Sequence, residues 1–164
     1  MKYLKQALLI LIITVVQTVI CPYIKIGGII PDLLFVYAVY HALNGKKLAD
    51  AMIVASICGV VTDCFTGRIF GVYVSVYLVC AVCAFCFKET VFKNGIILNI
   101  IIFFALCIIG ESLFYTMNIG VLKDAGYFYS LMKIILPEAF YNTLIFIIVS
   151  VIRKRMRKRK AGGF

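Results

Sequence analysis

Long apolar runs, separated by short polar breaks, follow one another along the whole chain. A helix that crosses the hydrocarbon core of a bilayer needs about 20 mostly apolar residues. Read as one helix, residues 48–87 would be about 60 Å long at 1.5 Å per residue, so the chain must turn back at Thr66-Gly67-Arg68. The pattern therefore predicts six membrane-spanning helices, at about residues 4–21, 29–43, 48–66, 69–87, 95–117 and 127–152.

The composition also indicates a membrane protein. Hydrophobic residues make up 64% of the 164-residue chain, whereas soluble domains are about 45–50% apolar. The apolar runs leave no room for a separate soluble domain, so we expect an all-α integral membrane protein with a six-transmembrane-helix bundle. Residues 1–164 are predicted to form a single six-span membrane domain that ends in a basic cytoplasmic tail, residues 153–164.

Lysine and arginine are distributed unevenly between the two predicted sides. Of the 17 cations, all but Lys25, Arg68, Lys123 and Lys133 fall at the termini and in the second-to-third and fourth-to-fifth loops. Cytoplasmic loops carry an excess of Lys and Arg, so both termini are predicted to face the cytoplasm.

The basic tail directly follows an apolar helix. This position favours contact with anionic membrane lipids and argues against nucleic-acid binding. Its cations are Arg153, Lys154, Arg155, Arg157, Lys158, Arg159 and Lys160.

The second predicted helix is short. From Pro31 to Leu43 there are too few residues to cross about 30 Å at 1.5 Å per residue. Pro31 suits the first turn of a helix, and Asp32 suits the positive end of the helix dipole. We therefore expect this helix to begin below the outer surface, where irregular backbone must be covered by protein or line a wet cavity. The hypothesis is an outward-facing polar cup.

Four acidic residues lie in the outer half of the predicted bundle or near its middle. They are Asp32, Asp63, Glu111 and Glu138. Asn142 shares a helix face with Glu138, one turn away. Carboxylates inside a membrane cost about 2.5–3.5 kcal/mol on insertion scales, and Arg68 is the candidate partner of Asp63 across the turn. Two interpretations stay open: these groups hold the helices together, or they form a cup that receives a partner.

Small residues recur every four positions in the third predicted helix, at Ala55, Gly59, Asp63 and Gly67. They share one helix face. Small residues allow helices to approach closely, so this face is predicted to pack either within the chain or against a helix of another chain.

Three cysteines, Cys80, Cys83 and Cys86, repeat a C-x-x-C spacing in the fourth predicted helix. A closed metal site needs four ligands, and the one histidine, His41, lies on a different helix. We interpret the cysteines as small apolar fillers. Since no catalytic constellation is present in the sequence, we expect no cofactor, no metal and no enzymatic activity.

Three local patterns occur in a fixed order along the chain. They are "PDLLFVYAVYHAL" (Pro31, Asp32), "GVVTDCFTGRIFG" (Gly59, Asp63, Gly67, Gly71) and "LPEAFYNTLIF" (Pro137, Asn142). With the length, span pattern and basic tail, these motifs make the chain similar to the rod shape-determining MreD family over nearly its whole length. The family's turn often carries Ser, Gly or Pro where this chain has Arg68, and Glu138 is not required by the resemblance.

The candidate partner-binding or structural polar cluster combines these motif residues with the acids. Its members are Pro31, Asp32, Gly59, Asp63, Gly67, Arg68, Gly71, Glu111, Pro137, Glu138 and Asn142.

The resemblance implies a non-catalytic scaffold subunit of the cell-elongation (rod shape) complex, in the bacterial cytoplasmic membrane. Such proteins associate with MreC. With it they help organise the RodA glycosyltransferase, a class B penicillin-binding transpeptidase and the MreB filament during peptidoglycan synthesis.

The family is also similar in fold to the substrate-binding subunits of energy-coupling-factor transporters, which are six-helix bundles with an outward-facing site. The alternative function is therefore a substrate-capturing membrane subunit of a vitamin or metal transporter of that kind. Such subunits usually carry alanines four apart on the first helix, and "LLILIITVVQTVI" has no such pair.

Overall fold

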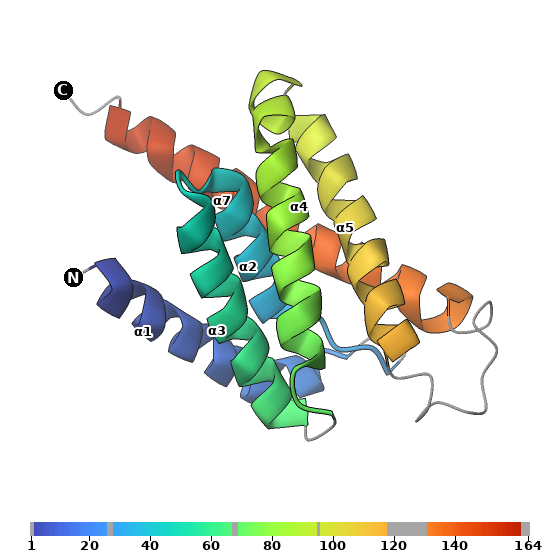
Figure 1. The fold of residues 1–164 in the computed structure, drawn as a ribbon. Helices are drawn as coiled ribbons and strands as arrows, with labels where there is room; N and C mark the ends of the chain where they lie inside the picture. Colours follow the sequence, from blue (N-terminus) through green and yellow to red (C-terminus); the bar gives the residue numbers. More distant parts are fainter. Residues whose placement is uncertain (1, 26–27, 67–68, 95, 118–130, 162–164) are drawn as a thin grey trace.

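The protein is all-helical in the residues that its structure describes. The computed structural model describes residues 2–25, 28–66, 69–94, 96–117 and 131–161 (Figure 1). The α-helices are α1 (Lys2–Val15), α2 (Leu33–Asn44), α3 (Leu48–Thr66), α4 (Val72–Asn94), α5 (Ile96–Met117) and α7 (Leu136–Ala161). Within these ranges, five helical segments are long and apolar enough to cross a bilayer, and α2 is a shorter apolar helix. The chain is a multi-pass membrane protein.

Shorter helical turns extend two of the long helices. The π turn η1 (Val16–Ile20) and the 3-10 turn η2 (Cys21–Tyr23) continue α1, and the π turn η3 (Leu131–Ile135) precedes α7. The first apolar segment therefore runs without a break from Lys2 to Tyr23.

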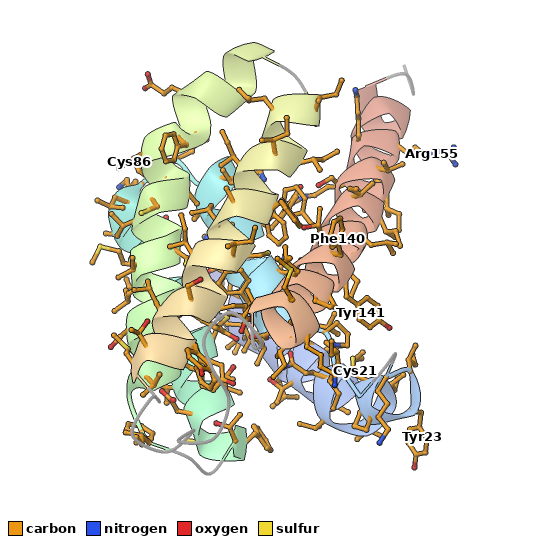
Figure 2. The ribbon with its side chains drawn as sticks, turned by 90° about the vertical axis from the view of Figure 1, so that its right-hand side faces the viewer. Cys21, Tyr23, Cys86, Phe140, Tyr141 and Arg155 are labelled. Carbon is orange, nitrogen blue, oxygen red and sulfur yellow. The ribbon has the colours of Figure 1, made fainter. Side chains whose placement is uncertain are left out.

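Successive helices run in alternating directions, so the helix ends gather at two opposite ends of the bundle (Figure 1). One end, here called the basic end, carries Lys46, Lys47, Lys88 and Arg153. The other, here called the acidic end, is where α1 finishes, α2 begins, α3 meets α4 and α7 begins. Figure 2 shows the two ends through Arg155 and Cys86 at the basic end and Tyr23 at the acidic end.

The shortest helix, α2, lies at the centre of the bundle. At 12 residues it is about 18 Å long, too short to cross a hydrocarbon core of about 30 Å. It packs against α1, α3, α4 and α7. Its buried side chains are Leu34, Phe35, Val36, Ala38, Val39, Tyr40, Ala42 and Leu43. The expectation of a short second helix is confirmed, and its burial explains why a segment too short to span is apolar on nearly every face.

The helices α3 and α4 approach each other closely at Gly59. A methyl group placed on Gly59 would lie 2.5 Å from the Cα atom of Val74 and 2.8 Å from its backbone nitrogen. Ala55 and Asp63, one turn to either side, are buried as well. In this structure the small-residue face of α3 is therefore covered by α4 of the same chain.

Cations at the basic end also contribute to packing. The Lys88 Nζ donates a hydrogen bond to the backbone carbonyl of Gly45 at 3.0 Å and lies 4.1 Å from the centre of the Phe85 ring. Arg153 lies 5.1 Å from the centre of the Tyr40 ring. The Lys88 hydrogen bond and the Arg153 contact attach α4 and α7 to the last turns of α2.

Four predicted helix ends are wrong. The second predicted helix begins at Leu33 instead of residue 29, because Asp32 caps it from outside the helix. The fourth predicted helix begins at Val72 and continues to Asn94, because Gly71 adopts a left-handed backbone that α4 cannot include. The last helix continues through the basic run to Ala161, beyond the expected end at residue 152, because Lys and Arg are good helix formers. The expected start of the last helix, at residue 127, lies outside the described residues.

Candidate functional site

The polar site is built around Asp32, which caps the N-terminus of α2. Its Oδ1 accepts a hydrogen bond from the backbone N–H of Phe35 at 3.1 Å. A carboxylate at this position satisfies an amide that has no partner within the helix and also interacts favourably with the helix dipole. The preceding residue, Pro31, is buried and is tolerated because α2 begins after it. The expectation that Asp32 lies at the positive end of this helix is confirmed.

Gln17 connects the first helical segment to the start of α2 through two hydrogen bonds. It lies in the π turn η1, and such turns often occur at functional positions in helices. Its Nε2 donates to Asp32 Oδ1 at 3.3 Å, and its Oε1 accepts from the backbone N–H of Leu34 at 3.0 Å. One amide side chain thus connects α1 to both the cap and the first turn of α2.

Three further elements contribute to the same cluster. The Tyr77 hydroxyl of α4 donates to Asp32 Oδ2, and the Tyr77 oxygen lies 3.2 Å from the Thr62 hydroxyl of α3. From α7, the Asn142 Oδ1 accepts from the backbone N–H of Asp32 at 2.8 Å. We call Gln17, Asp32, Thr62, Tyr77 and Asn142 the Asp32 cluster.

The hydrogen bonds of the Asp32 cluster join helices of the bundle to one another, so these bonds have a structural role. Asn142 is completely buried, and its Nδ2 has no hydrogen-bond partner among the described residues. An unsatisfied buried donor costs about 1–3 kcal/mol. The side chain is nevertheless held there, because its oxygen satisfies the backbone of Asp32 beside the cap.

Asp63 forms a second cap, at the N-terminus of α4. Its Oδ2 accepts from the backbone N–H groups of Gly71 at 3.0 Å and Val74 at 3.2 Å. Its Oδ1 accepts from the N–H of Tyr73 at 3.1 Å. Gly71 has a φ of 99°, which favours glycine. Asp63, on α3, therefore fixes the turn and the start of the next helix through three backbone amides.

The remaining predicted site residues are not part of the two helix caps formed by Asp32 and Asp63. Gly67 and Arg68 lie outside the described residues, so the expected pairing of Asp63 with Arg68 is not tested. Pro137 is the second residue of α7, which directly follows the π turn η3. Glu111 on α5 lies close enough to Glu138 and Asp32 for their charges to interact.

A cavity of about 410 Å³ opens beside the Asp32 cluster at the acidic end. Its lining residues come from the end of α1, η1, η2, the segment before α2 and its start, the end of α3 and the starts of α4 and α7. They are Thr14, Gln17, Thr18, Pro22, Ile30, Pro31, Asp32, Leu34, Thr62, Phe65, Thr66, Tyr73 and Glu138. Asp32 and Glu138 thus share one cavity, while Asp63 and Glu111 do not belong to its lining.

The cysteines of α4 are not gathered around a common centre with other ligands. Cys80 is buried, and its thiol donates to the carbonyl of Leu106 at 3.7 Å, whereas Cys86 is exposed (Figure 2). In the described part of the chain, no group of three or more His, Cys, Asp or Glu residues is arranged to hold a metal ion.

Sequence reasoning missed three members of the Asp32 cluster: Gln17, Thr62 and Tyr77. Gln17 was detectable, because it is the one amide between residues 7 and 24 of an apolar helix, and polar side chains within membrane helices often bond across helices. Thr62 and Tyr77 resemble the many other Thr and Tyr residues of the chain, and only the fold brings them to Asp32.

Comparison with known proteins gives one family match. The model of the family described as rod shape-determining protein MreD matches residues 1–159. Comparisons with curated proteins and with solved structures found no match.

Proposed function

We propose that this chain, which belongs to the MreD family of rod shape-determining proteins, is a non-catalytic scaffold subunit of the bacterial cell-elongation complex. Family membership assigns the chain to rod shape determination, and its apolar helices embed it in a membrane. The finer part of the proposal is that the protein binds an MreC-like protein and thereby helps organise peptidoglycan synthesis. RodA, a class B penicillin-binding transpeptidase and MreB are the further partners that we propose.

The proposal of a non-catalytic role rests on the hydrogen bonds that the carboxylates of Asp32 and Asp63 accept. Asp32 caps α2 and binds Gln17 and Tyr77. Asp63 accepts three backbone hydrogen bonds at the start of α4. A catalytic carboxylate must reach a proton of the substrate at hydrogen-bond distance. These two are instead occupied by groups that hold the bundle together, which supports a function in binding.

The partner proposal is tested by co-expression of the tagged chain with the MreC-like protein of the same bacterium. After extraction in a mild detergent, we expect the two proteins to elute together at constant ratio in size-exclusion chromatography. An unrelated multi-pass membrane protein carrying the same tag is the control. Separate elution of the two proteins, with the chain itself still folded, would contradict the proposal.

We further propose that the basic end faces the cytoplasm and the acidic end faces outward. The excess of cations at the basic end supports this orientation. Single cysteines introduced at Tyr23 and Lys154 in a chain without its native cysteines would be treated with an impermeant thiol reagent on intact spheroplasts. Labelling at position 23 and protection at position 154 are expected; the reverse pattern would invert the orientation.

A further inference from the structure

The cavity at the acidic end offers an unusual set of hydrogen-bonding groups. Four of its lining side chains are threonines, and each hydroxyl donates a hydrogen bond to a backbone carbonyl one turn earlier. The distances are 2.8 Å for Thr14 to Ile10, 2.9 Å for Thr18 to Thr14, 3.0 Å for Thr62 to Cys58 and 3.0 Å for Thr66 to Thr62. A hydroxyl has one proton and two lone pairs. While these bonds are made, Thr14, Thr18 and Thr66 offer a ligand acceptors, whereas Thr62 is also engaged with Tyr77.

The charged groups of the cavity are acceptors too. Asp32 and Glu138 both line it, and its lining among the described residues includes no lysine or arginine. The Asp32 carboxylate has donors in Gln17, Phe35 and Tyr77. In contrast, no described group donates a hydrogen bond to the Glu138 carboxylate. Glu138 is half-buried, and a carboxylate in a membrane helix without a donor among the described residues costs free energy, which a cation in the cavity would reduce.

The size of the cavity distinguishes between kinds of cation. About 410 Å³ is room for roughly a dozen water molecules at about 30 Å³ each. A bare divalent ion needs several ligands at about 2.0–2.6 Å, and no described cluster is arranged for one. A primary ammonium or a guanidinium group on a short carbon chain supplies several N–H donors and fills more of the space.

We propose that this cavity binds one organic cation of the ammonium or guanidinium class, with Glu138 as its main counter-charge and the threonine hydroxyls as acceptors. Asp32 contributes negative charge from a position fixed by its cap. The apolar residues Pro22, Ile30 and Phe65 in the lining contact the carbon chain. The site is inferred from the cavity alone and does not depend on the partner proposal.

The test uses the purified full chain in nanodiscs of zwitterionic lipid, titrated by calorimetry with n-butylammonium and with methylguanidinium. We expect saturable binding of the cations and none of n-butanol, the neutral control. Glu138→Gln should weaken binding at least tenfold, whereas Glu89→Gln, an exposed glutamate near the other end of the bundle, should leave it unchanged. Equal heats for n-butanol, or equal affinity in Glu138→Gln, would overturn the proposal.

A second variant keeps the test decisive if Glu138→Gln fails to fold. Thr18→Val removes one acceptor from the lining without changing the charge of the chain, and we expect a several-fold loss of affinity. Unchanged affinity in folded Thr18→Val, in that case, would overturn the assignment.

The same titration on the co-purified partner complex identifies the source of the cation. If a Lys or Arg side chain of the partner fills the cavity, the complex no longer binds n-butylammonium although the chain alone does. If the ligand is a diffusible amine, both bind it. Either result supports the site. If the chain alone binds no cation, the site is rejected and the partner proposal is unaffected. If the MreC-like protein does not co-purify, the partner proposal is rejected and the site is unaffected.

Discussion

Replacing Asp63 by alanine removes the acceptor of three backbone N–H groups at the start of α4. A hydrogen bond to a charged group contributes about 1.5–3 kcal/mol net, and loss of a helix cap typically costs about 0.5–2 kcal/mol. The three bonds share one side chain, and water can reach some of the freed amides at a helix end, so the sum is not additive. We expect Asp63→Ala to lower the free energy of unfolding by about 3 kcal/mol.

The measurement is equilibrium unfolding in mixed micelles with increasing mole fraction of sodium dodecyl sulfate, followed by circular dichroism. Asp63→Asn keeps one acceptor oxygen and should therefore lose less stability than Asp63→Ala, although its amide nitrogen cannot replace the second acceptor. Glu89→Ala, an exposed acid on α4, is the control and should unfold like the unmodified chain. Unfolding of Asp63→Ala within about 0.5 kcal/mol of the control would refute the assignment of Asp63 as the cap on which this turn depends.

Three further predictions concern packing, the Asp32 cluster and the basic tail. Gly59→Ala should destabilise the chain by about 1–3 kcal/mol through overpacking in the same assay, and Ser56→Ala, one turn earlier, should not; equal stability would mean that α4 can move away. Gln17→Leu removes two hydrogen bonds, so a loss of about 2 kcal/mol is expected; a more stable variant would show that apolar packing replaces them. Replacing the seven cations of residues 153–160 by glutamine should weaken binding to anionic vesicles by up to about 1 kcal/mol per residue while the MreC-like protein still co-purifies, and loss of co-purification would instead assign the tail to the partner interface.

The hydrophobic pattern predicts the helices well because each apolar run needs an environment without water. It identified α2 as too short to span and placed Asp32 at its positive end, but it put Pro31 in the first turn, whereas the helix begins two residues later, at Leu33. Helix ends were less predictable. The end of α7 was misplaced because a basic run can leave the membrane and still remain helical.

The partners of the acids were not predictable from the sequence. The described partners of Asp63 are three backbone amides, and any residue can supply an amide; its pairing with Arg68, which lies outside the described residues, stays a prediction. Tyr77 lies 45 positions from Asp32, so only the packing of α4 against α2 brings them together. The close contact at Gly59 shows the same limit: the spacing indicated a packing face, and the fold identified α4 as its partner.

The central claim is that the chain acts by binding other proteins of the rod-shape complex. It is tested most directly by affinity purification of the chain from native membranes in a mild detergent, with identification of every protein and small molecule that elutes. We predict an MreC-like protein in a constant ratio to the chain. Recovery of an ATPase module together with a tightly bound vitamin or metal ion, without any MreC-like protein, would contradict the claim.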